Sequence, residues 1–150
     1  MTLYHWDQPY ELYKKGGWLN PDSPKWFAEY ARTVGEALGD RVKHFITFNE
    51  PQVFIGLAFV DGVHAPGHRM SRAETLLMAH HVLLAHGMAS QALRACVPEV
   101  QVGYAPTSDV PVPVSDSPEM CIRDRYRAAG DYTDECEGEG YPLSMRDGTD

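Results

Sequence analysis

Asn49 and Glu50 stand side by side at the end of an apolar run, and this pair is the stretch of the sequence best suited to chemistry. Residues 42–49 are rich in Phe, Ile, Val and Thr, which is typical of a buried strand. Pro51 should end the extended run, because it lacks an N–H and restricts the residue before it. In α/β folds, ligands bind outside the carboxyl ends of the strands. We therefore predict that Glu50 is a proton donor at a ligand-binding rim.

A second short strand ends in residues that suit the same rim. Residues 2–6 are aromatic and β-prone, and they finish in His5 and Trp6. Trp supplies a flat apolar face for a sugar ring and one N–H donor, whereas Asn supplies both a donor and an acceptor. His64 lies in a Gly- and Pro-rich loop that we expect above this rim. Parallel strands would thus bring His, Trp, Asn and Glu to a hydroxyl-rich ligand.

Simpler roles remain open for several of these residues. A carboxylate at a strand end, such as Glu50, also serves to cap a neighbouring helix or to pair with an arginine. His80, His81 and His86 fall in a helical pattern without the H-E-x-x-H spacing of a metal site, so we expect packing or hydrogen-bonding roles for them. The cysteines likewise show no metal-binding spacing.

A helix should join the two strands. Asp22 or Ser23 can cap its start, Pro24 suits its first turn, and Gly39 supplies its end. Strand, helix and strand in this order form a βαβ unit, which implies parallel strands and a right-handed crossover. The carboxyl ends of both strands are therefore expected at the same edge of one sheet.

A second unit should follow Pro51. We expect mainly a long structured loop over 52–70, which could hold a helical turn. A helix from Arg72 to about Cys96 that begins with a capping box should follow, and then a third strand over 100–105. The periodicity predicts that the helix turns one set of residues inward. These are Leu76, Leu77, His80, Leu83, Leu84, Gly87, Met88 and Leu93.

Composition sets broad limits on function. Hydrophobic residues make up 43% and charged residues 23% of the chain, as in soluble globular proteins, and no apolar run approaches the roughly 20 residues that span a membrane. The net charge of −8 argues against a nucleic-acid partner. The first residues lack the pattern of a secretory signal, so we expect a cytoplasmic protein.

Four motifs, taken together, resemble glycoside hydrolase family 1, which contains β-glucosidases, β-galactosidases and 6-phospho-β-glycosidases. They occur in family order at family-like spacing, and the resemblance covers about residues 2–118. The motifs are Leu3-Tyr4-His5-Trp6-Asp7 with Pro9, Asp40-Arg41-Val42-Lys43, Thr47-Phe48-Asn49-Glu50-Pro51 and His64-Ala65-Pro66-Gly67.

The resemblance implies a (β/α)8 TIM barrel and retaining hydrolysis of β-glycosides without metal or cofactor. Glu50 would be the general acid/base, and Asn49 would hold the sugar 2-hydroxyl. His5 and Trp6 would bind hydroxyls of the non-reducing sugar. The aglycone side would be lined by Gln52, Val53, Leu57 and His64. Many members have Trp where Gln52 stands, so this position bears on aglycone preference.

Two departures from the family pattern limit what the chain should do alone. A retaining glycosidase needs a second carboxylate about 5–5.5 Å from the first, and the family's Thr-Glu-Asn-Gly-like motif is absent. Asp7 and Asp61 are the nearest alternatives, but neither matches that motif. A whole barrel also takes about 250 residues. We therefore expect an inactive partial barrel, about strands three to five with the two intervening helices.

Two further expectations concern the extent and the class of the chain. We expect the barrel portion to occupy residues 1–118 and the acidic segment 119–150 to be an irregular, disordered tail outside the native fold. The alternative to an enzyme is a non-catalytic carbohydrate-binding module. In it, the rim residues would contact sugar without hydrolysing it.

Overall fold

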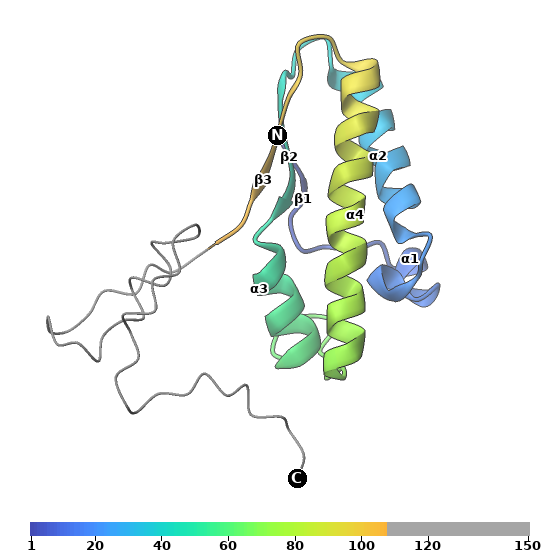
Figure 1. Cartoon of the computed structure of the whole chain (residues 1–150), viewed down its shortest axis with the longest axis vertical. Coiled ribbons are helices and arrows are strands. Elements are labelled where there is room, and N and C mark those ends of the chain that lie inside the picture. The colour runs from blue at the N-terminus through green and yellow to red at the C-terminus, as the bar shows by residue number, and fades with distance from the viewer. Residues whose placement is uncertain (108–150) are drawn as a thin grey trace, which may run out of the picture. The chain divides into compact units, whose positions relative to one another are not determined.

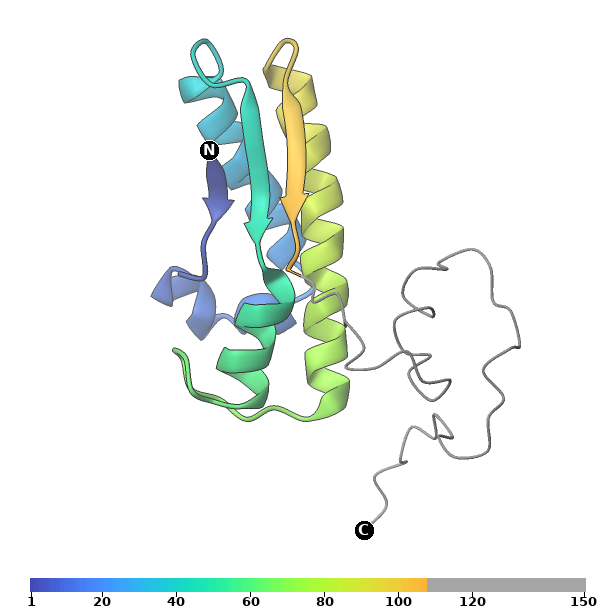
Figure 2. The same cartoon turned by 90° about the vertical axis from the view of Figure 1, so that its left-hand side faces the viewer.

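A three-stranded sheet organises residues 1–107, the part of the chain that the computed structural model describes. Two long helices cover one face of this sheet (Figure 1), and no helix of residues 1–107 covers the other (Figure 2). The elements are β1 (Thr2–Tyr4), α1 (Tyr10–Lys14), η1 (Gly17–Leu19), α2 (Ser23–Leu38), β2 (His44–Asn49), α3 (Pro51–Ile55), η2 (Gly56–Val60), α4 (Arg72–Cys96) and β3 (Gln101–Ala105). The predicted barrel boundary at 118 and the predicted tail 119–150 lie outside the described residues.

The strands run in the order β1-β2-β3, and each neighbouring pair is parallel. This confirms the predicted strand–helix–strand units, because parallel neighbours need a crossover connection, which α2 and α4 supply. All three carboxyl ends consequently meet at one edge of the sheet (Figure 2). We call this edge, with the residues that directly follow each strand, the rim.

Helix α2 begins and ends where its sequence signals predict. Pro24 lies in its first turn, and the Gly39 N–H donates to the Gly35 carbonyl at its end. Asp22 is the residue before the helix, but neither Asp22 nor Ser23 makes the predicted capping bond. The two glycines also set how closely α2 meets the end of α4. A Cβ at Gly35 would lie 2.8 Å from Cys96 Sγ, and one at Gly39 would lie 2.6 Å from a methyl of Val97. Larger residues would push the two helices apart.

Helix α4 has the predicted bounds and the predicted capping box. The Ser71 hydroxyl accepts from the Glu74 N–H at 3.3 Å, and the Ser71 N–H donates to the Glu74 carboxylate at 2.8 Å. The bond from the Ser71 hydroxyl to the same carboxylate, together with that from the Ser71 N–H, lowers the pKa of Glu74. Two of the first unpaired groups of the helix are thereby satisfied.

The predicted inward face of α4 is wrong, apart from Leu93. Leu76, Leu77, Leu83 and Leu84 are exposed, as are His80 and Gly87, and Met88 is half-buried. The helix instead buries the opposite face, which consists of Met78, His81, Val82, Ala85, Ala89, Ser90 and Leu93. The periodicity could not choose, because both faces of α4 are apolar. The face with the smaller side chains packs inward, since Ala permits close approach to α2.

The prediction of mainly loop over 52–70 is also wrong for its first part. Residues 51–60 form α3, followed by the π-helical turn η2. Pro51 occupies the first helical position, where its missing N–H costs nothing and its fixed φ suits the helix. The residue that ends β2 therefore also begins a helix. The short helices α1 and η1 lie in the connection between β1 and α2.

An aromatic cluster fills the core between the sheet and α2. Phe48 is fully buried and stacks on Phe27 with ring centroids 4.5 Å apart, and Tyr4 lies 5.3 Å from Trp18 and 5.5 Å from Phe48. Tyr4 and Phe48 are paired residues of β1 and β2, close to the carboxyl ends of both strands. The rim thus stands directly on this buried aromatic cluster.

Two helix histidines fix the α4 side of the same core. His81 Nδ1 lies 2.8 Å from the Trp18 carbonyl oxygen, and His86 Nδ1 lies 2.8 Å from the Thr47 hydroxyl. Burial, and to a lesser extent the charge of Arg94, lowers the pKa of His86. Their predicted hydrogen-bonding roles are confirmed.

Candidate active site

Strand β2 changes its pairing just before Asn49 and Glu50. From Ile46 to Asn49 it advances three residues while β3 advances two, from Gly103 to Ala105. Thr47 and Phe48, within this irregularity, are both buried. Such bulges re-aim the side chains that follow them, and they are frequent beside active sites. Here the bulge delivers Asn49 and Glu50 to the rim, half-buried rather than packed in the core.

The peptide unit between Asn49 and Glu50 is held from both neighbouring strands. Its carbonyl oxygen, on Asn49, accepts from the indole N–H of Trp6 at 2.9 Å. Its N–H, on Glu50, donates to the Ala105 carbonyl at 2.8 Å. The first partner follows β1 and the second ends β3, so one peptide plane spans the rim. We call this arrangement the peptide clamp.

Glu50 occupies this position in an unusual backbone conformation. Its φ is 43° and its ψ is 60°, in the left-handed region that side chains other than glycine rarely adopt. The turn allows the Glu50 carbonyl to accept from Val53 and Phe54, which starts α3 immediately. Strain of this kind persists only where surrounding contacts impose it, and the peptide clamp is such a contact.

Trp6 is itself held by the core beneath it. Its φ of 80° is also left-handed, and its carbonyl accepts from the Tyr4 hydroxyl at 3.3 Å. That hydroxyl in turn accepts from the indole N–H of Trp18 at 3.2 Å. Burial is the main cause that raises the pKa of Tyr4 to about 12, so the phenol stays protonated and remains a donor. A chain of hydrogen bonds therefore links the buried cluster to the peptide clamp.

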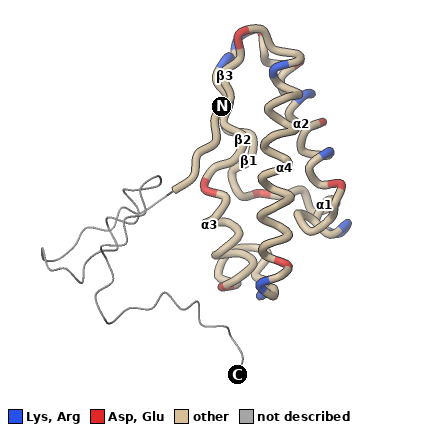
Figure 3. Tube along the Cα trace, in the orientation of Figure 1, with Lys and Arg blue, Asp and Glu red and all other residues tan. Residues whose placement is uncertain are grey.

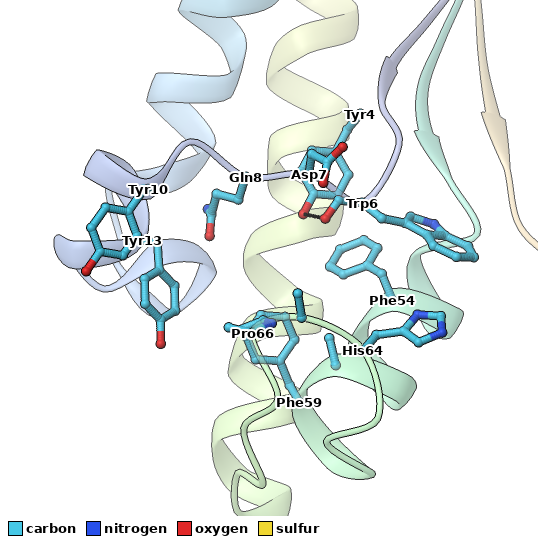
Figure 4. A pocket seen from close by; sticks show the side chains of 12 residues that line it. Tyr4, Trp6, Asp7, Gln8, Tyr10, Tyr13, Phe54, Phe59, His64 and Pro66 are labelled. Atoms are coloured by element: carbon cyan, nitrogen blue, oxygen red, sulfur yellow. Dashed lines mark hydrogen bonds between the residues drawn. The ribbon is translucent and has the colours of Figure 1, made fainter.

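Three of the predicted rim side chains form an aromatic row. The rings of His5 and Trp6 lie 5.7 Å apart, and Trp6 and His64 also lie 5.7 Å apart. Because the Trp6 N–H is already donated to Asn49, Trp6 offers a ligand its ring rather than its donor. The row joins residues that are 59 positions apart along the chain, and Figure 4 shows its Trp6 and His64 members.

The residues predicted for the aglycone side lie on α3, η2 and the loop after them. The carbonyl of Leu57 accepts from the N–H groups of Val63 and His64 at 2.9 and 3.0 Å, so Leu57 fixes the loop that carries His64. Val53 is half-buried one turn before Leu57. Gln52 is exposed, and its amide donates to the Thr107 carbonyl just beyond β3.

A cavity of about 230 Å³ opens beside the aromatic row. Figure 4 shows Trp6 and His64 on one side of it and Tyr10 and Tyr13 on the other. Asp7 and Gln8 supply polar groups, and the apolar lining comes from Tyr4, Phe54, Ala58, Phe59, Ala65 and Pro66. Aromatic faces with a few polar groups are typical of small-molecule sites, including sugar sites. Glu50 does not line this cavity.

The Glu50 carboxylate makes no side-chain cap on α3 and no ion pair with residues 1–107. The structural roles considered for it, capping a helix or pairing with an arginine, are therefore not observed in the described part. The two carboxylates considered as its partner occupy different places. Asp7 lines the cavity, and Asp61 is exposed at the end of η2.

Residues 1–107 contain neither a metal-binding cluster nor a membrane span. No three His, Cys, Asp or Glu side chains converge there as metal ligands would. Nor is any helix of this part long and apolar enough to cross a membrane.

Sequence reasoning found the rim residues but missed how they are held. The structure brings His5, Trp6, Asn49 and His64 together, with Glu50 beside them. It adds Ala105, whose carbonyl holds the Glu50 N–H, and Tyr4, which supports Trp6. These contacts are made by backbone groups or buried hydroxyls, and no motif marks them. The start of α3 did have a signal, which was Pro51 at a first helical position.

Known proteins match this chain in both sequence and structure. The family model of glycosyl hydrolase family 1 matches residues 1–145. A β-glucosidase of Agrobacterium sp. is 44% identical over 115 residues, which are 77% of this chain and 25% of that protein. A 1,4-β-D-glucan glucohydrolase of Thermotoga neapolitana is 44% identical over 103 residues, 69% of this chain and 24% of that protein.

Solved structures match over a similar share. The β-glucosidase of Thermotoga maritima in complex with deoxynojirimycin has a TM-score of 0.75 at 39% identity, over 83% of this chain and 28% of that one. The chain thus spans about a quarter of the length of the relatives it matches.

Proposed function

Because the chain belongs to glycosyl hydrolase family 1, we propose that it is the part of a retaining β-glycosidase that carries the general acid/base, Glu50. The observation that supports this most is the peptide clamp. It holds a glutamate in a strained conformation at the carboxyl ends of parallel strands, with its carboxylate unpaired among residues 1–107. A carboxylate that serves only structure has no need of such a position.

In the proposed reaction, Glu50 acts twice. It first donates a proton to the glycosidic oxygen as the bond between that oxygen and the anomeric carbon breaks, so the aglycone leaves as a neutral alcohol. It then removes a proton from the water that attacks the glycosyl-enzyme intermediate. Fixing the 49–50 peptide from two strands keeps the carboxyl in place for both steps, since positioning is a large part of the catalytic effect.

The other rim residues would bind the sugar. The Asn49 side-chain amide would bond the 2-hydroxyl, a contact that strengthens in the transition state. His5 would bind hydroxyls of the non-reducing sugar, and the ring of Trp6 would pack against its apolar face. Gln52, Val53, Leu57 and His64 would meet the aglycone, on the side where the loop held by Leu57 stands.

The remainder of the site would come from other parts of a whole (β/α)8 barrel. We assign β1, β2 and β3 to its third, fourth and fifth strands, with α2 and α4 as the intervening helices. The nucleophile would stand on a later strand, about 5–5.5 Å from Glu50. The sheet face without a helix would then line the interior of the barrel (Figure 2).

The substrate we propose is a β-linked glucoside. This rests on the relatives, which are named β-glucosidase and 1,4-β-D-glucan glucohydrolase, and on a T. maritima β-glucosidase solved with glucoimidazole. The aromatic row, in which His5 and His64 are exposed and Trp6 is half-buried, suits a sugar ring in either class of function, enzyme or carbohydrate-binding module.

A graft tests the proposal. Residues 1–107 replace the matching segment of the T. maritima β-glucosidase, and hydrolysis of a chromogenic β-glucoside is measured. We expect turnover by the graft and none by the 150-residue chain alone. Glu50→Gln in the graft should lower kcat/KM by about 100-fold or more, whereas the matched control Asp61→Asn should leave it unchanged.

Two results would count against the proposal. Glu50-dependent turnover by the isolated chain would show that the second carboxylate lies within it. A folded graft that binds glucose, shown by chemical-shift changes, but hydrolyses the β-glucoside equally slowly with and without the Glu50→Gln substitution would favour the carbohydrate-binding module.

A further inference from the structure

Strand β2 turns two consecutive side chains, Thr47 and Phe48, toward the helix layer that α2 and α4 form on one face of the sheet. Thr47 contacts His86 of α4, and Phe48 stacks on Phe27 of α2. In a regular strand, successive side chains point to opposite faces. The alternation is therefore reversed between these two residues. Asn49 is turned away from the helix layer, which it would otherwise face together with Thr47.

The hydrogen bonds between β2 and β3 locate this reversal. The Gln101 N–H donates to the Lys43 carbonyl, and a regular parallel ladder would then bond every second residue of β2 to β3. That ladder would bring the Asn49 N–H to the Ala105 carbonyl, but the Glu50 N–H occupies this place instead. The pairing consequently contains one extra residue of β2 within the bulge. A slip of one residue exchanges the faces of the side chains that follow.

The Thr47 side chain, within the bulge, is bonded to two other elements. Its hydroxyl lies 2.8 Å from His86 Nδ1 on α4 and donates to the Gly103 carbonyl of β3 at 3.3 Å. A carbonyl can only accept and a hydroxyl has one proton, so both bonds form together only when His86 donates from Nδ1. Thr47 is fully buried, and loss of either bond would leave a buried polar group without a partner.

His86 is in surroundings that suit this donor role. No Asp, Glu, Lys or Arg stands on α4 between Glu74 and Arg94 (Figure 3), and β2 and β3 carry none either. The Tyr104 ring lies 5.0 Å from the imidazole. Burial, and to a lesser extent the charge of Arg94, lowers the pKa of His86, which favours the neutral ring with a single N–H. The contact with Thr47 then places that proton on Nδ1.

We propose that Thr47 and His86 are positioning residues, whose hydrogen bond holds the bulge of β2 in its observed register. That register presents Asn49 and Glu50 at the rim. Neither positioning residue would touch the substrate, because both side chains meet on the helix side of the sheet. Without the bulge, Asn49 would face the helix layer and the Glu50 N–H would lose its bond to Ala105. The consequence for catalysis rests on the proposed function, whereas the hold on the bulge does not.

Nuclear magnetic resonance of the 150-residue chain tests the hold on the bulge. At about pH 8, above the ordinary pKa of histidine, the ring nitrogen shifts of His86 should show the proton on Nδ1. Thr47→Val removes the hydroxyl, and it should abolish this tautomer preference and accelerate hydrogen exchange of the Glu50 amide, relative to the α2 amides, at least about tenfold. Thr47→Ser keeps the hydroxyl and should preserve both properties. The matched control Thr33→Val removes a hydroxyl that donates within α2, and it should change neither.

Kinetics of the graft into the T. maritima β-glucosidase test the consequence for catalysis. A misplaced general acid matters most for aryl β-glucosides with weakly acidic phenols, which need proton donation. Thr47→Val should therefore lower kcat/KM for these substrates at least about tenfold more than for substrates with acidic phenols. A graft that is merely destabilised loses activity by the same factor on every substrate, because only the amount of folded enzyme changes. Thr47→Ser should restore the wild-type dependence on the phenol.

Three results would overturn the proposal. One is a wild-type His86 that carries its proton on Nε2. Another is a Thr47→Val chain whose Glu50 amide exchanges no faster, relative to the α2 amides, than that of Thr33→Val. The last is a Thr47→Val graft that is slowed equally on all substrates while Glu50→Ala is selective for weakly acidic phenols. If Glu50→Ala is itself unselective, the proposed role of Glu50 fails instead, and the first two measurements still decide whether the bulge is held.

Discussion

The rim and the helix layer behind the sheet are held together in two different ways. The helix layer is made by packing: Phe48, Phe27 and the small residues of α4 fill the space between the sheet and α2. The rim is made by a few hydrogen bonds, of which the peptide clamp is the centre, and two of its residues have strained backbones. The helix layer stabilises the fold, and that stability keeps the strained rim residues, including Glu50, in their conformations.

This contrast explains why the described chain has an ordered rim although it spans about a quarter of its relatives. The clamp needs only β1, β2 and β3, and all three are present. The proposed second carboxylate, by contrast, needs another strand. One half of the proposed catalytic pair is therefore preorganised without the other.

Breaking the helix layer should have the largest effect. Phe48→Ala removes a fully buried ring that contacts Tyr4, Trp18 and Phe27. We expect the free energy of unfolding in urea to fall by about 3–5 kcal/mol, and the rim to be lost with the layer. Phe48→Leu should cost clearly less. A loss below about 1 kcal/mol for the alanine variant would show that the cluster is not the main source of stability.

Breaking the clamp should cost less and act locally. Trp6→Phe keeps an aromatic ring but removes the donor to the Asn49 carbonyl, so we expect a loss of about 1–1.5 kcal/mol. Hydrogen exchange of the Glu50 amide, which is bonded to Ala105, should accelerate more than that of the α2 amides. Trp26→Phe is the matched control, because the Trp26 indole donates no bond among residues 1–107. Equal effects of the two variants would contradict the clamp.

Relieving the strain at Glu50 should stabilise the chain. At φ 43° a glycine carries no steric penalty, so Glu50→Gly should raise the free energy of unfolding by about 1 kcal/mol, less its own entropic cost. Glu50→Gln keeps the strain and should change little, since the carboxylate has no partner in residues 1–107. If both variants destabilise the chain, the rim is not strained in the way the backbone angles indicate.

The smallest effect is expected from pH acting on the helix layer. Since burial lowers the pKa of His86, the unfolded chain binds its proton more readily than the folded chain. Stability should therefore fall as the pH drops through about 6.5 and level off below the folded pKa. Solvent screening keeps this effect small. His86→Gln should reduce the difference in the free energy of unfolding between about pH 7 and pH 5. If this difference is the same in the variant and the wild type, His86 is not its cause.

The sequence predicted the parts of the fold that depend on local signals. Capping residues and glycines marked both long helices, and apolar runs marked the strands, so the parallel βαβ order is confirmed. The sequence did not predict which face of α4 is buried, because the hydrophobic periodicity fits either face. Both faces of α4 are apolar with the same periodicity, and the structure buries the face that includes Ala85 and Ala89.

In the candidate site, too, local motifs identified the residues, whereas the contacts between them were found only in the structure. Motifs identified His5, Trp6, Asn49, Glu50 and His64, and the structure brings them to one rim. The bond from Trp6 to Asn49 joins residues 43 positions apart, and the bulge in β2 depends on its pairing with the distant β3. Interactions of that range leave no local pattern, so they required the structure.

The most direct test asks whether Glu50 protonates a leaving group. In the graft of residues 1–107 into the T. maritima β-glucosidase, kcat/KM is measured for aryl β-glucosides whose phenols range from acidic to weakly acidic. An acidic phenol departs without proton donation, so Glu50→Ala should change kcat/KM little for the substrates with the most acidic phenols. For the substrates with the least acidic phenols it should lower kcat/KM by about 100-fold or more. If the variant slows all of these substrates by the same factor, Glu50 is not the general acid.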